Sequence, residues 1–72
     1  MTRQEFEAWA VAHGWIKDQW GHYHKGDRRF KVSKVAVRLE ANAGATGWVR
    51  LRSGYFSRLS ISETGKLAGL QL

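Results

Sequence analysis

The 72-residue sequence contains no cysteine and no proline. Without cysteine, neither a disulfide nor a thiolate metal site can stabilise the chain, and nothing indicates an oxidising compartment. Apolar runs are only a few residues long, and Arg3, Glu5 and Glu7 lie where a signal peptide would be hydrophobic. The sequence therefore predicts a soluble, cytoplasmic protein that has no membrane partner and no cofactor.

The chain is also too short for a large core. One small domain over residues 1–72 buries only about 60% of its unfolded surface. Four Trp, two Tyr and three Phe supply much of the missing apolar area, since each aromatic side chain buries on the order of 150–250 Å². We therefore expect several aromatic residues to be structural.

Acidic residues are few. Six Asp and Glu stand against twelve Lys and Arg, which gives a formal net charge of +6. The excess is concentrated between Lys25 and Arg58, where nine basic residues face only Asp27 and Glu40. Such a basic field favours anionic partners. The dispersed carboxylates form no close pair suited to acid–base or two-metal catalysis, so we expect a protein that is not an enzyme.

The N-terminal segment predicts a helix over residues 3–13. Thr2 and Glu5 have the spacing of a capping box, in which each side chain accepts a hydrogen bond from the other residue's backbone amide. One stripe of the helix then carries Phe6, Trp9, Ala10 and His13. Gly14 suits the left-handed residue that commonly follows a helix.

Alternating polarity predicts strands after this helix. A short aromatic strand (20–24) leads through a turn (25–27) into a longer strand (28–40). The apolar phase of the longer strand slips near Ser33 and Lys34, which predicts a β-bulge that returns both apolar sets to one face.

The C-terminal half predicts further strands. A loop (40–46) precedes a strand from Gly47, which either turns at residues 53–55 into a fourth strand or continues, bent, through Gly54. A final turn (63–66) precedes a short strand or helical turn containing Leu67, Leu70 and Leu72. The predicted fold class is α+β, with one N-terminal amphipathic helix packed on a bent antiparallel sheet of three to five strands.

One side of this sheet is expected to be basic and aromatic. Strand alternation separates an outward set (Trp48, Arg50, Arg52, Phe56 and Arg58) from an inward set (Val49, Leu51, Leu59 and Ile61). The neighbouring strand adds Arg29, Lys31, Lys34 and Arg38 to the outward side. Neighbouring like charges destabilise a sheet, so this pattern favours a partner that brings negative charge.

These nine outward residues form the candidate nucleic-acid-binding site. Arg and Lys pair with phosphates, while Trp48 and Phe56 would stack on bases of RNA or DNA. Three alternatives remain open. The face could dock on an acidic protein surface, as in a small inhibitor of phage or mobile-element type; it could be an ordinary solvated face; or an apolar edge could pair two copies into a homodimer.

The histidines allow two further interpretations. His22 and His24 are spaced to share one face of a strand, but the third ligand of a metal site, His13 or Asp27, has no supporting spacing, so we expect no metal. The segments His13-Gly14-Trp15 and Gly21-His22-Tyr23-His24 resemble the start of HicA-type toxin ribonucleases over about a third of the chain. That resemblance implies His22 as a general acid or base. The Ser of that family's Gly-Ser-His element is missing, and we expect no closing helix, so the chain is not assigned to the family.

Overall fold

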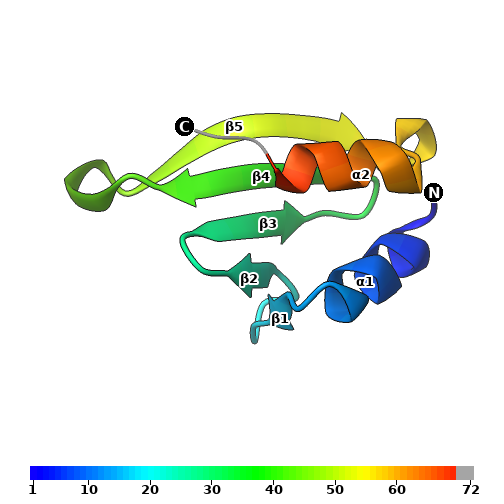
Figure 1. Cartoon of the computed structure of the whole chain (residues 1–72), viewed down its shortest axis with the longest axis horizontal. Helices are drawn as coiled ribbons and strands as arrows, with labels where there is room; N and C mark the ends of the chain where they lie inside the picture. The colour runs from blue at the N-terminus through cyan, green and yellow to red at the C-terminus, as the bar shows by residue number, and fades with distance from the viewer. Residues whose placement is uncertain (70–72) are drawn as a thin grey trace.

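The computed structural model describes residues 1–69 and shows five antiparallel strands and two α-helices (Figure 1). The elements are α1 (Arg3–Ala12), β1 (Ile16–Lys17), β2 (Tyr23–Lys25), β3 (Arg28–Val32), β4 (Ala36–Asn42), β5 (Trp48–Tyr55) and α2 (Ile61–Ala68), with short 3-10 helices η1 (Gly44–Thr46) and η2 (Phe56–Arg58) on either side of β5. The strands pair in chain order, β1 to β5. The α+β fold class, with an N-terminal helix on an antiparallel sheet, is confirmed.

The predicted N-terminal helix forms as α1. Its capping box is present: the Glu5 amide donates to Thr2 Oγ1 at 3.1 Å, and the Thr2 amide donates to Glu5 Oε1 at 2.8 Å. Phe6, Trp9 and Ala10 are buried, as the stripe predicted. The helix ends before Gly14, which has the expected positive φ of 84°.

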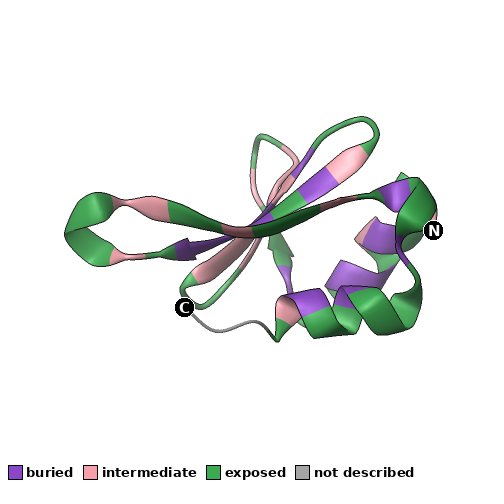
Figure 2. Cartoon of the chain, turned by 90° about the horizontal axis from the view of Figure 1, so that it is seen from above, coloured by how far each residue is buried: buried purple, intermediate pink, exposed green. Residues whose placement is uncertain are grey.

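Both helices lie on the same side of a strongly twisted sheet (Figure 2). Beneath them, aromatic and aliphatic side chains from α1, the sheet, η2 and α2 form one hydrophobic cluster. Phe30 of β3 is fully buried in this cluster, in edge-to-face contact with Phe6 and 4.5 Å from the Trp15 ring centroid. We call the opposite side of the sheet, which neither helix covers, the open face.

The predicted single strand over residues 28–40 is wrong, because the chain reverses within it. β3 ends at Val32 and β4 begins at Ala36, and the two pair antiparallel with Val32 opposite Val37. Ser33 closes this turn, since its amide and Oγ both donate to the Ala36 carbonyl at 2.9 Å. A turn, rather than a bulge, therefore brings the two apolar sets onto one face.

The C-terminal half also differs from the prediction. β5 runs through Gly54 as one strand, so the alternative of a hairpin at residues 53–55 is wrong. Helix α2 replaces the predicted turn at 63–66 and supplies a closing helix that was not expected; Leu67 packs in its core, while Leu70 and Leu72 lie outside the described residues. Within residues 1–69, neither helix has the length and apolar character needed to cross a bilayer.

Candidate nucleic-acid interface

A β-bulge in β5 decides where its arginines point. Arg50 pairs with Glu40, and Arg52 pairs with Leu39, so Leu51 is an extra residue with no partner on β4. Because an extra residue shifts the alternation by one, Arg50 lies on the open face, whereas Arg52 lies on the helix side with buried Leu39. The expectation that Arg50 and Arg52 share one face is therefore wrong.

Phe56 and Arg58 do not join the open face either. β5 gives way to η2 at Phe56, and this turn directs the Phe56 ring into the core, where it is 4% exposed and 5.6 Å from the Phe6 ring centroid. A buried ring offers no surface for a base, so the predicted stacking by Phe56 is wrong. Arg58 is exposed in η2 and lines a pocket between β5 and α2.

The remaining predicted residues lie close together on the open face or next to it. The open face of β3, β4 and β5 carries Arg29, Lys31, Arg38, Trp48 and Arg50. Lys31 is paired with Arg38 across the β3–β4 ladder, which places two cations side by side. Lys34 is exposed in the neighbouring turn. The alternation of β3 and β4 therefore positions the cations as the sequence predicted.

Glu40 is the carboxylate at the centre of this face. It accepts a hydrogen bond from Arg29 Nε at 2.7 Å and lies 3.7 Å from Arg38 Nε. Although the Glu40 side chain points away from the helices, the residue is only 7% exposed. Glu40 therefore lies beneath Arg29 and Arg38 and neutralises part of their charge. In contrast, no ion pair joins Lys31 or Arg50 to a carboxylate of residues 1–69.

Trp48 contacts two neighbouring side chains on the open face. The Arg29 guanidinium carbon lies 4.2 Å from the centroid of the indole ring, a cation–π contact. The His24 ring approaches the indole edge-on, with centroids 6.1 Å apart. Trp48 remains half-buried, so part of the indole ring is accessible on the open face.

A shallow cavity of about 380 Å³ lies within the open face. Its polar lining includes His22, Lys31, Arg38, Arg50, Ser33 and Ser53, and no carboxylate. We call this cavity the face groove. It joins cations from three neighbouring strands to hydroxyl and imidazole groups, a set that can bind phosphate oxygens.

The tautomer of His22 is fixed by the backbone. Its Nδ1 accepts a hydrogen bond from the Val32 amide at 2.9 Å. Because an amide N–H can only donate, Nδ1 is unprotonated and the neutral ring carries its proton on Nε2. The neutral ring can therefore act as a hydrogen-bond donor through Nε2–H.

Asp18 organises the loop that carries His22. Its Oδ1 accepts from the amides of Trp20 and His22, each at 2.9 Å, and its Oδ2 lies 2.7 Å from His24 Nε2. Partial burial acts to raise the pKa of Asp18, but the hydrogen bonds from His22, His24 and Trp20 outweigh it and lower the pKa to about 2. His22 and His24 thus have separate partners, and no group of three possible metal ligands occurs within residues 1–69.

The low pKa of Asp18 predicts a pH-dependent loss of stability. The reference pKa of an unfolded Asp is about 3.9, so the folded chain holds this proton less tightly. The ionised Asp18 carboxylate therefore stabilises the fold fully above about pH 4, and this stabilisation is lost as the pH falls towards about 2. Urea unfolding at several pH values should show wild type more stable than Asp18→Asn near neutral pH, with the difference shrinking in acid.

The control for this measurement is Gln19→Ala, which changes the neighbouring residue without removing a titratable group. Its difference in unfolding free energy from wild type should stay constant over the same pH range. A constant difference for Asp18→Asn as well would show that the carboxylate contacts contribute nothing that depends on charge.

The nine predicted residues did not include His22 or Ser53, which line the face groove, or Glu40, the buried counter-ion of Arg29. His22 and His24 both lie on the open face, as their spacing predicted, but their ring nitrogens have different partners. Of the aromatic side chains in the segment predicted as a strand (20–24), Tyr23 is buried and Trp20 is exposed.

Searches of the chain against protein-family models, curated proteins and solved structures find no match.

Proposed function

We propose that the open face binds nucleic acid in the cytoplasm without catalysing a reaction. The observation that carries the proposal is the face groove, in which Lys31, Arg38 and Arg50 converge with no lining carboxylate. Neighbouring strands lie about 4.8 Å apart, so cations on three strands can contact more than one phosphate. RNA and DNA share this phosphate chemistry.

The neighbouring groups support the same proposal. The Nε2–H of His22 and the hydroxyls of Ser33 and Ser53 can donate to phosphate oxygens around the cations. Trp48, braced by Arg29, offers a flat surface beside them. Stacking of one base on an aromatic side chain contributes about 1–3 kcal/mol, which adds to the electrostatic attraction.

Binding should depend on the groove cations and on salt. We expect the double variant Arg38→Gln/Arg50→Gln to bind oligonucleotides about 10-fold more weakly than wild type at about 50 mM salt, because two charge-assisted contacts are lost. The slope of log affinity against log salt should become shallower by about 0.7 for each single-strand phosphate contact removed. Fluorescence anisotropy at about 50 and 200 mM salt measures both quantities.

The matched control is Arg3→Gln/Lys17→Gln, which removes the same net charge from exposed positions outside the open face. It should reduce affinity much less than the groove variant. Equal losses in the two double variants would contradict a defined site. No binding by wild type at low salt would overturn the proposal and would favour docking of this face on an acidic protein.

A further inference from the structure

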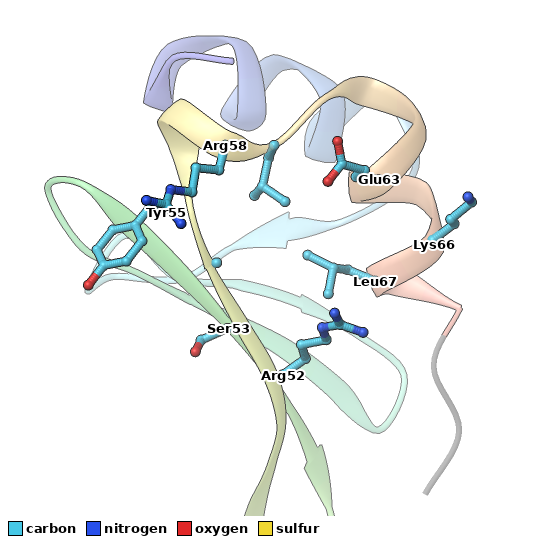
Figure 3. A pocket seen from close by; sticks show the side chains of 9 residues that line it. Arg52, Ser53, Tyr55, Arg58, Glu63, Lys66 and Leu67 are labelled. Carbon is cyan, nitrogen blue, oxygen red and sulfur yellow. The ribbon is translucent and has the colours of Figure 1, made fainter.

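A second basic cavity lies on the other side of β5. It has a volume of about 360 Å³ and is lined by Arg52, Arg58 and Lys66 around the apolar side chains of Leu59 and Leu67. Figure 3 shows Arg52 on the same side of β5 as Lys66 and Leu67 of α2. We call this cavity the edge pocket.

The edge pocket carries an excess of positive charge. No ion pair joins Arg52, Arg58 or Lys66 to a carboxylate of residues 1–69. Glu63 also lines the pocket, but its Oε1 already accepts a hydrogen bond from Ser60 Oγ at 3.1 Å at the start of α2. Three cations therefore outnumber one engaged carboxylate.

The two cavities meet at β5, the last strand of the sheet. Ser53 lines both the face groove and the edge pocket. The bulge at Leu51 places Arg50 on one side of this strand and Arg52 on the other. Basic groups consequently continue around the edge of the sheet instead of stopping at the open face.

An exposed aromatic ring lies near Ser53, the residue that lines both cavities. Tyr55, at the end of β5, is 57% exposed and also lines the edge pocket. In Figure 3 its ring and the Ser53 side chain lie on the side of β5 opposite Arg52. An exposed ring in this position can stack on a base whose flanking phosphates lie in the two cavities.

We propose that the ligand is a single-stranded nucleic acid that crosses β5 and places phosphates in both the face groove and the edge pocket. This inference rests on the proposed function and specifies its substrate class. A double helix bends little over tens of base pairs, since its persistence length is about 150 base pairs, so it would contact the cations on one side only. A single strand can follow the edge and leaves its bases free to stack on Tyr55.

A second copy of the chain fits this edge poorly. Antiparallel pairing of two β5 strands would bring the Arg50 and Arg52 side chains of both copies close together. Like charges in neighbouring cross-strand positions destabilise a sheet, and charged side chains on an edge strand oppose such pairing. Charge complementarity therefore favours an anionic strand over a homodimer at β5.

The test compares single- and double-stranded oligonucleotides of about 12 nucleotides or base pairs. Arg52→Gln/Arg58→Gln should weaken single-strand binding about 10-fold and duplex binding by less than about twofold. Tyr55→Ala should weaken single-strand binding by at least about fivefold, the lower bound expected for losing one stacked base. Far-ultraviolet circular dichroism and thermal unfolding would establish that the variants, all at exposed positions, remain folded.

Three outcomes separate this inference from the proposed function. If Arg38→Gln/Arg50→Gln weakens binding but Arg52→Gln/Arg58→Gln does not, the open face binds nucleic acid and the crossing of β5 is wrong. Equal losses for single strands and duplexes in the edge-pocket variant would also overturn it. If no oligonucleotide binds wild type at low salt, the proposed function itself fails.

Discussion

Phe30→Ala is expected to lower the free energy of unfolding by about 3–5 kcal/mol, the usual range for truncating a buried aromatic side chain. Phe30 is fully buried and lies near the rings of Phe6, Trp9 and Trp15. These three rings belong to α1 and the segment that follows it. The ring of Phe30 fills the space between them and the sheet, and no single neighbour can fill the cavity that its removal leaves. The loss is severe for this chain, since typical stabilities predict about 4–11 kcal/mol for 72 residues.

Urea unfolding followed by tryptophan fluorescence would measure this loss. The conservative variant Phe30→Leu should be destabilised less, because it keeps most of the apolar volume. Val35→Ala is the surface control, as Val35 is exposed in the β3–β4 turn, and a change within about 0.5 kcal/mol is expected there. A loss below about 1 kcal/mol in Phe30→Ala would contradict the central position of this ring in the core.

Side-chain alternation correctly predicted which side of the sheet each residue faces wherever the strand ladder is regular. On β3, Phe30 and Val32 are buried, while Arg29 and Lys31 lie on the open face. Trp48 and Arg50 also share that face, because both precede the bulge. In these segments, side chains alternate strictly between the two sides of the sheet, so their orientation can be predicted without knowing the rest of the fold.

The same alternation failed after Leu51 because the bulge leaves no mark in the sequence. Leu51 is apolar and was predicted to face inward, and it does pack partly against the core. Its lack of a partner on β4 depends on how β4 and β5 align, which a single strand does not specify. The prediction therefore joined Arg52 to Arg50, although the structure separates them across β5.

The β3–β4 turn and helix α2 were not predicted, for different reasons. The β3–β4 turn contains Ser33, Lys34 and Val35, without the Gly, Pro, Asn or Asp that usually indicate a turn, and only hydrogen bonds to Ala36 reveal it. For α2 a signal was present: Ser60 and Glu63 have the spacing of a helix cap, and the Glu63 amide donates to Ser60 Oγ at 3.1 Å. Gly65 within the segment instead suggested a turn.

Glu40→Gln is expected to change stability and binding in opposite directions. Arg29 and Glu40 form a largely buried pair, with side-chain exposures of 22% and 9%. Glutamine keeps the shape and one acceptor but removes the charge opposing Arg29 and Arg38. Since a buried charge that loses its counter-ion is costly, the free energy of unfolding should fall by about 2 kcal/mol, below the cost of deleting the partner outright.

Oligonucleotide affinity, in contrast, should rise by about 3- to 10-fold at about 50 mM salt, because the variant removes the carboxylate at the centre of the open face. Glu7→Gln is the control: it removes one negative charge from α1 and should raise affinity much less. Saturating oligonucleotide should also raise the melting temperature of Glu40→Gln more than that of wild type, because bound phosphate replaces the missing counter-ion. Weaker binding by the folded variant would contradict this account, since Glu40 would then be needed to position the arginines and would not compete with the ligand for them.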